Sequence, residues 1–197
     1  GIDALTHAIE AYVSRKANMF SDGLALQAMG LIAPNLRRVW TDPGDRAARE
    51  AMMLGATQAG IAFSNASVAL VHGMSRPIGA HFHVAHGLSN AMLLPAVTAF
   101  SAPAAIDRYA ACARAMKIAG PDTDDRSAVS ALVSELEALN DDLDVPGPQE
   151  YGIDPARWEA LLPTMAAQAL ASGSPANNPL EPSADEIVAL YRRVWAG

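Results

Sequence analysis

The chain has 197 residues, 51% of them hydrophobic and 18% charged, so it can bury a core as a single domain. Its net charge is −7 and its 14 Lys and Arg residues form no run longer than a pair, which excludes nucleic acid and anionic membrane surfaces as partners. No segment reaches the ~18 consecutive apolar residues that a membrane helix needs. The single cysteine, Cys112, cannot form an internal disulfide, and we therefore expect a cytoplasmic protein.

Helical periodicity runs through nearly the whole chain. In residues 2–13, apolar side chains recur at spacings of one, three and four residues, which predicts an amphipathic helix. Similar patterns predict further helices at 21–39, 46–63, 86–100, 103–118, 124–140, 155–171 and 183–195, and a Pro-rich connection at 141–151. The last helix opens with Ser183 and Glu186 at the spacing of a capping box. We therefore expect an all-α fold, a multi-helix bundle of seven to nine helices forming one domain over residues 1–197.

Proline and glycine interrupt this pattern in the stretch VHGMSRPIGAHFHVAHG, residues 71–87. Proline removes a backbone donor and clashes with the preceding turn. We predict that one helix ends at residues 72–75, that the chain bends around Pro77, and that the next helix begins at His86. For the same reason Pro34 is expected to kink the helix at 21–39.

The same stretch carries four of the five histidines of the chain, His72, His81, His83 and His86. The fifth, His7, follows Asp3 by four residues, so a helix places the carboxylate and the imidazole on one face. A bend after His72 would turn His72 and His86 toward a common point, and these side-chain types bind divalent ions. The alternative is that these histidines form hydrogen bonds in the core or face water.

Two segments carry a family resemblance: GIDALTHAIEAY and GIAFSNASVALVHGMSRPIGAHFHVAHGLSNAMLLPAV. They resemble the C-terminal helical domain of the iron-containing alcohol dehydrogenase family, and the similarity continues to the closing NNPLEPSADEIVALYRRVW. The most specific feature is the pairing of D-x-x-x-H with two histidines fourteen positions apart. The resemblance implies four metal ligands, Asp3, His7, His72 and His86, holding Fe²⁺ or Zn²⁺.

The resemblance also implies a function. Family enzymes oxidise a small alcohol or reduce the corresponding aldehyde or ketone, and an N-terminal α/β domain binds their NAD or NADP. No glycine-rich phosphate loop is present here, so we expect that domain to be absent and this chain alone to be inactive. A homo-oligomer, in the simplest case a dimer, is expected.

Two departures from the family pattern concern catalysis. Arg76 stands where many relatives carry a histidine, and Leu180 where an arginine is common. Arginine stays protonated, so we predict that Arg76 holds a cofactor phosphate or a substrate carboxylate, unless it is simply a surface residue. We predict that His81 or His83, which would share a side on extended backbone, relays the proton instead. The alternative for this pair is a structural role.

Three other functions stay open. The same four ligands and a water molecule would suit a stand-alone helical metal-binding protein or metal hydrolase. A non-catalytic helical assembly module would need no ion at all. Within the dehydrogenase class, a metal-free enzyme similar to maleylacetate reductases is disfavoured, because all four ligand types are present. The identity of the alcohol, of the nicotinamide cofactor and of the metal is not encoded in these motifs.

Overall fold

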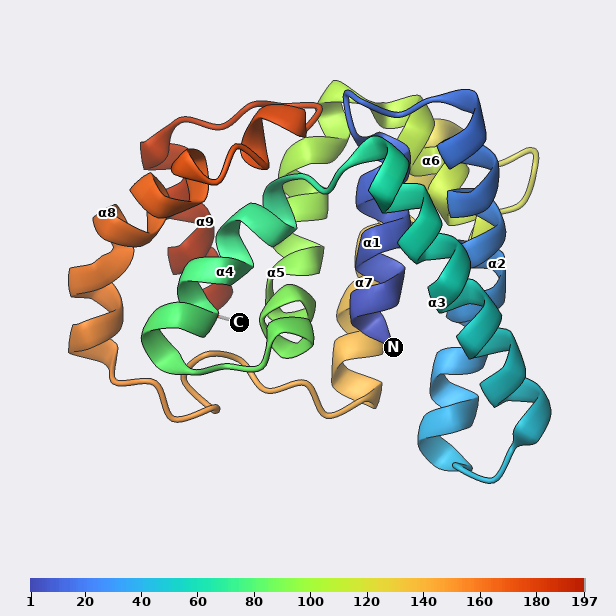
Figure 1. Cartoon of the computed structure of the whole chain (residues 1–197), viewed down its shortest axis with the longest axis horizontal. Coiled ribbons are helices and arrows are strands. Elements are labelled where there is room, and N and C mark those ends of the chain that lie inside the picture. Colours follow the sequence, from blue (N-terminus) through green and yellow to red (C-terminus); the bar gives the residue numbers. More distant parts are fainter. Residues whose placement is uncertain (197) are drawn as a thin grey trace.

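Nine α-helices and two short 3-10 helices make up the computed structural model, and no strand occurs among the residues it describes, 1–196 (Figure 1). The helices are α1 (Ile2–Val13), α2 (Met19–Thr41), α3 (Arg46–Ala66), α4 (Leu70–Phe82), α5 (His86–Ser101), α6 (Ile106–Ala115), α7 (Asp125–Asp142), α8 (Pro155–Ala171) and α9 (Ala184–Ala196). The 3-10 helices are η1 (Ala102–Ala104) and η2 (Pro175–Asn177). The expected all-α bundle is confirmed.

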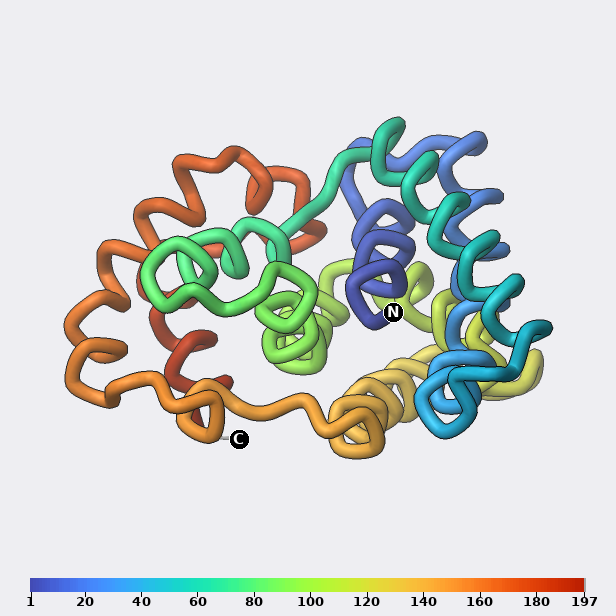
Figure 2. Tube along the Cα trace, turned by 60° about the horizontal axis from the view of Figure 1, so that its bottom comes forward, coloured from blue at the N-terminus to red at the C-terminus, as the bar shows by residue number. Residues whose placement is uncertain are grey.

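Helices α4 and α5 form a hairpin between two groups of helices. On one side lie α1, α2 and α3, and on the other lie α8 and α9; both views show this order (Figures 1 and 2). Helix α1 packs against α2, α3 and α5, so it occupies the middle of the molecule. Its residues Leu5 and Ile9 are fully buried, with Met29 and Ile32 of α2 in the same core. The position of α1 is thus fixed by packing against three other helices.

The predicted break inside residues 71–87 was wrong in position. Helix α4 runs without interruption from Leu70 through Pro77 to Phe82, and the chain turns at residues 83–85. A proline inside a helix costs ~3 kcal/mol. Burial of Met74 and Ile78, both with no exposed surface, is worth ~1.5–3 kcal/mol each and offsets that cost.

The end of α4 also corrects the expectation of extended backbone around His81. His81 is in the last helical turn, and His83 is the C-cap with a left-handed backbone, φ 57° and ψ 26°. Helix α2 contains Pro34 in its interior, and the predicted kink there stays a prediction. For α4, the prediction gave too much weight to the local cost of proline and too little to the packing that the helix gains.

Other predicted boundaries agree closely with the structure. The predictions for α1 and α8 match to the residue, whereas the predicted helix at 103–118 is divided into η1 and α6. At the start of α9, the Ser183 N–H donates to Glu186 Oε2 at 2.8 Å and the Glu186 N–H donates to Ser183 Oγ at 3.3 Å, so the capping box is confirmed.

A buried tyrosine joins the C-terminal helices α8 and α9 to the α4–α5 hairpin. Tyr191 of α9 donates from its hydroxyl to the Met74 carbonyl at 2.7 Å, and its ring meets Trp158 of α8 edge-on. Within residues 1–196, no single helix is long and apolar enough to cross a membrane; α3 and α4 pass that test only together, as a pair bent by 103°.

Candidate metal centre

Helix α1 supplies two of the predicted ligands. Asp3 lies in its first turn, where the helix dipole favours a carboxylate, and His7 follows one turn later. His7 Nδ1 is 2.7 Å from the Asp3 carbonyl oxygen. Because that oxygen only accepts, Nδ1 carries the proton and Nε2 is left with a free lone pair. Phe63 of α3 covers the other side of the imidazole, with ring centroids 4.4 Å apart.

Helix α4 supplies His72 from its first turn. His72 is 3% exposed, and its Nδ1 lies 2.6 Å from Oε2 of Glu10, which is also 3% exposed. In a neutral imidazole the single N–H, on Nδ1, donates to this carboxylate, and Nε2 of His72 then also presents a lone pair.

Helix α5 supplies His86 as its first residue. Its Nε2 is 3.8 Å from Asp3 Oδ1, and half of the side chain is exposed. The next residue, Gly87, lets α5 approach α1 closely: a Cβ atom there would lie 3.1 Å from the Cβ of Asp3.

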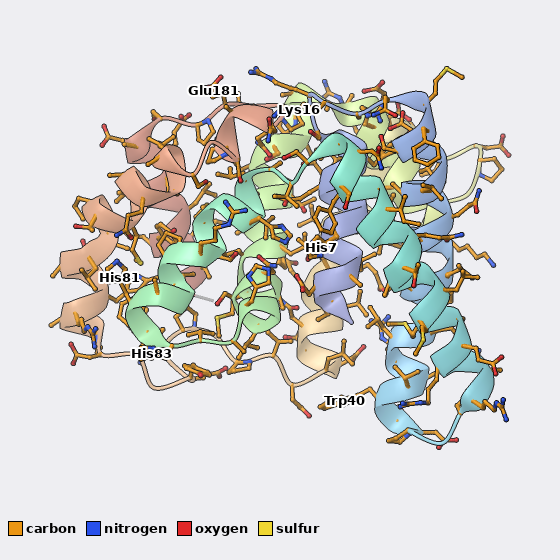
Figure 3. All side chains as sticks on the ribbon, in the orientation of Figure 1. His7, Lys16, Trp40, His81, His83 and Glu181 are labelled. Atoms are coloured by element: carbon orange, nitrogen blue, oxygen red, sulfur yellow. The ribbon has the colours of Figure 1, made fainter. Side chains whose placement is uncertain are left out.

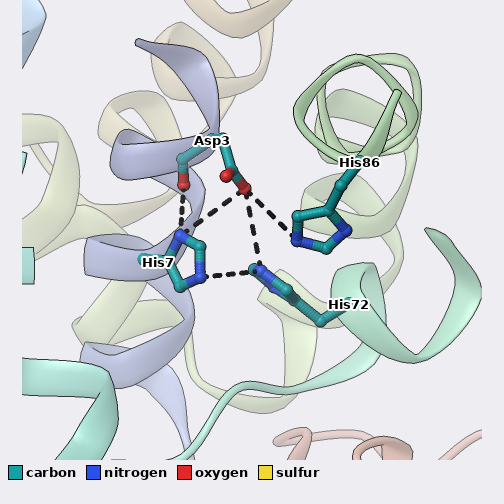
Figure 4. A group of neighbouring side chains, drawn as sticks. All are labelled: Asp3, His7, His72 and His86. Carbon is teal, nitrogen blue, oxygen red and sulfur yellow. Dashed lines mark hydrogen bonds and ion pairs between the residues drawn. The ribbon is translucent and has the colours of Figure 1, made fainter. Parts of the chain in front are cut away.

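The four side chains meet at one point (Figure 4). One ligand atom from each lies within 4.8 Å of all the others. The Nε2 atoms of His7 and His72 are 3.0 Å apart. Both rings carry their proton on Nδ1, so these two lone pairs face each other without a hydrogen between them. Two nitrogen ligands of one divalent ion, each at ~2.1 Å, lie about 3.0–3.4 Å apart, so the arrangement fits a shared cation.

An amide nitrogen lies among the same atoms. Asn90 Nδ2 is 2.6 Å from Asp3 Oδ1 and 3.2 Å from Nε2 of both His72 and His86. Asn90 is fully buried, and its Oδ1 has no hydrogen-bond partner among residues 1–196. A donor group with partial positive charge is thus drawn into a cluster of acceptors, which is the environment that a cation prefers.

The protonation of His7 supports the same interpretation. Burial lowers the pKa of His7, and the neighbouring His72 lowers it further. The neutral imidazole is the form that binds a metal ion, so this environment favours the ligand form near neutral pH.

Sequence reasoning missed Glu10 and Asn90. Glu10 follows His7 by three residues on the same face of α1, and Asn90 follows His86 by four on α5. Helical spacing from a predicted ligand was therefore the available signal for both.

The structure does not bring Arg76, His81 or His83 into this cluster. Arg76 lies one turn beyond His72 and donates from Nη1 to Ser174 Oγ at 3.0 Å. His81 Nε2 is 2.9 Å from Gln168 Oε1 on α8, and His83 is exposed. Figure 3 shows both histidines near the turn at the end of α4, well away from His7.

Comparison with known proteins identifies the fold. A model of the C-terminal part of the Fe-containing alcohol dehydrogenase family matches residues 1–195. The chain belongs to the iron-containing alcohol dehydrogenase family. It is 37% identical over 195 residues to lactaldehyde reductase of Escherichia coli K12, covering 99% of this chain and 50% of that protein. It is 36% identical to 1,3-propanediol dehydrogenase of Klebsiella pneumoniae, covering 99% and 50%.

Solved structures of iron-containing alcohol dehydrogenases agree with this family membership. A 1,3-propanediol oxidoreductase superposes with a TM-score of 0.92 at 34% identity, covering 98% of this chain and 50% of the other. The enzyme of Thermococcus thioreducens superposes with a TM-score of 0.87 at 33% identity, covering 100% and 49%. The chain thus spans about half the length of the relatives it matches, and the family resemblance seen in the sequence is confirmed.

Proposed function

We propose that this chain is the metal-bearing half of an NAD(P)-dependent alcohol dehydrogenase that oxidises a small alcohol or reduces the corresponding aldehyde or ketone. The observation that carries the proposal is the convergence of Asp3, His7, His72 and His86, with one ligand atom from each within 4.8 Å of the others and the Nε2 atoms of His7 and His72 3.0 Å apart. Relatives named for butanol, lactaldehyde and 1,3-propanediol support a small alcohol or aldehyde as the substrate class.

In this proposal Asp3, His7, His72 and His86 hold one divalent ion, Fe²⁺ or Zn²⁺. When bound, such an ion polarises the oxygen of an alcohol or carbonyl group and makes an alcohol a stronger acid. The exposure of the ligand side chains defines the approach: the side chain of His72 is 4% exposed and that of His7 17%, whereas those of Asp3 and His86 are 32% and 50% exposed. Substrate therefore reaches the centre from the side of Asp3 and His86, and His7, His72 and Phe63 form the closed wall.

The nicotinamide cofactor, which takes up or gives the hydride, is held mainly by the half of the relatives that this chain does not cover. Arg76 is exposed one turn beyond His72 and remains our candidate for an anionic group of cofactor or substrate. The relay role of His81 or His83 stays a prediction, and the bond between His81 and Gln168 favours the structural alternative. A homodimer in the cytoplasm is likewise a prediction.

The test uses the full-length enzyme that contains this chain. After anaerobic loading with Fe²⁺, and separately with Zn²⁺, NAD⁺ and NADP⁺ reduction is followed with butanol, 1,2-propanediol and 1,3-propanediol. We expect alcohol-dependent reduction that disappears in His7→Ala and His72→Ala. Ester hydrolysis by the same preparation, without alcohol oxidation, would instead support a metal hydrolase. A metal-loaded enzyme with neither activity would contradict the proposal.

A further inference from the structure

A buried carboxylate, Glu10, lies behind the proposed ligands and is not itself one of them. It is on α1, three residues after His7, and is 3% exposed. Its Oε1 accepts from the Val71 N–H at 2.6 Å. Its Oε2 accepts from the Ala69 N–H at 3.0 Å and from His72 Nδ1 at 2.6 Å. A carboxylate removed from water is thus compensated by three donors, all in the first residues of one segment.

Two of these donors belong to the beginning of α4. The first N–H groups of a helix have no partner within it, and a side chain at the N-cap normally accepts from them. The N-cap of α4 is Ala69, which makes no such bond. Glu10 supplies the missing acceptor from another helix, and its charge suits the dipole of α4 at this end. The carboxylate therefore fixes the start of α4, and with it His72, relative to α1.

The third donor decides whether the nitrogen of His72 that faces the cluster, Nε2, carries a proton. While the Nδ1–H of neutral His72 donates a hydrogen bond to Oε2 of Glu10, Nε2 carries no proton and points at Nε2 of His7. Without that acceptor the ring would gain a hydrogen bond by moving its proton to Nε2, because Nε2 of His7 lies 3.0 Å away and can accept it. The Asn90 amide nitrogen, 3.2 Å from the same atom of His72, would have to turn away. A bond between the two imidazoles would then occupy the lone pairs that an ion needs.

We propose that Glu10 is a positioning residue of this centre: it caps α4 from α1 and holds His72 in the Nδ1–H form, which keeps the two imidazoles from bonding to each other. The inference rests on the proposed function only in naming a metal ion as the occupant. The tautomer of His72 is a property of the metal-free protein and is measured separately.

Two variants test the proposal. Glu10→Leu has a similar size and no acceptor, so the proton of His72 should move to Nε2. Glu10→Gln keeps one acceptor oxygen and replaces the other by an NH₂ group. One oxygen cannot accept both from the Val71 N–H and from the pair of donors now at Oε2, so at least one donor faces the NH₂ group. We expect Zn²⁺ affinity, measured by competition with a chromophoric chelator, to fall about 10-fold in Glu10→Gln and about 100-fold in Glu10→Leu. Glu181→Gln is the matched control, because Glu181 is exposed and pairs with Arg15; the Zn²⁺ affinity of this variant should be unchanged.

The tautomer is observed by ¹H–¹⁵N NMR of the metal-free protein labelled with ¹⁵N-histidine and assigned with His72→Gln. We expect Nδ1–H in the parent and Nε2–H in Glu10→Leu, with equal helix content by circular dichroism. If Glu10→Leu does not fold, Glu10→Gln alone decides: a folded variant with the parent's Zn²⁺ affinity overturns the proposal. Retention of Nδ1–H in folded Glu10→Leu also overturns it. Failure of the parent to bind Zn²⁺, Fe²⁺ or Co²⁺ would instead overturn the proposed function, while the tautomers would still decide whether Glu10 controls His72.

Discussion

Replacement of Gly87 by alanine should weaken metal binding while leaving the stability of the fold nearly unchanged. Gly87 is the second residue of α5, and a Cβ atom there would lie 3.1 Å from Asp3 Cβ and 3.6 Å from Asp3 Cγ. Ordinary carbon–carbon contacts are ~3.5–4.0 Å, so Asp3 must withdraw by a few tenths of an ångström. Asp3 is the single carboxylate in the proposed ligand set, and a site of this kind must hold its ligands to within ~0.5 Å, so such a shift uses much of that margin and weakens binding moderately.

The expected magnitudes follow from two opposing terms. Alanine gains up to ~1 kcal/mol over glycine in a helix, and a tight contact of this size costs a comparable amount. The free energy of unfolding of the metal-free protein should therefore change by less than about 1 kcal/mol. Zn²⁺ affinity should fall about 3- to 10-fold, and ~1.4 kcal/mol corresponds to tenfold.

The assay combines urea unfolding of the metal-free protein with chelator competition for Zn²⁺. Gly60→Ala is the matched control, because a Cβ atom at this helical position of α3 would meet no atom of residues 1–196 outside its own helix within 4 Å. It should stabilise the protein by ~0.5–1 kcal/mol and leave the affinity unchanged. Unchanged Zn²⁺ affinity in Gly87→Ala, or loss of affinity only in step with a large loss of stability, would refute the reasoning.

Three further predictions concern other groups. Asn90→Ala should lower the stability of the metal-free protein by ~1.5–3 kcal/mol, because its bond to the Asp3 carboxylate is lost, and saturating Zn²⁺ should restore most of it; urea unfolding with and without Zn²⁺ decides this. The relay prediction requires that His81→Ala or His83→Ala lose most turnover near neutral pH in the full-length enzyme while keeping its metal; unchanged pH profiles in both would assign the pair to a structural role. Burial raises the pKa of Cys112 to about 12, so at pH 8 the folded thiol stays protonated and should not react with a thiol-specific disulfide reagent, whereas the urea-unfolded chain should react at once; rapid labelling of the folded protein would contradict the burial.

The sequence by itself determined most of the helices and the four predicted ligands, although not the end of α4 or the contribution of Glu10 and Asn90. Apolar periodicity predicted the bounds of α1 and α8 to the residue. Each of these helices is stabilised by burial of one apolar face, and the spacing of apolar residues along the sequence shows that face directly. The D-x-x-x-H spacing put Asp3 and His7 on one face of α1 for the same reason. The pairing of these residues with His72 and His86 also carried the family assignment.

The tertiary structure decided where the chain turns and what surrounds each histidine. Helix α4 passes Pro77 because neighbouring helices bury its apolar face, a gain that local propensity does not include. The bond between Glu10 and His72 joins residues 62 positions apart, and the bond between His81 and Gln168 joins residues 87 apart. Which nitrogen a histidine presents depends on such distant partners, so the ligand types were visible in the sequence while their protonation and orientation required the fold.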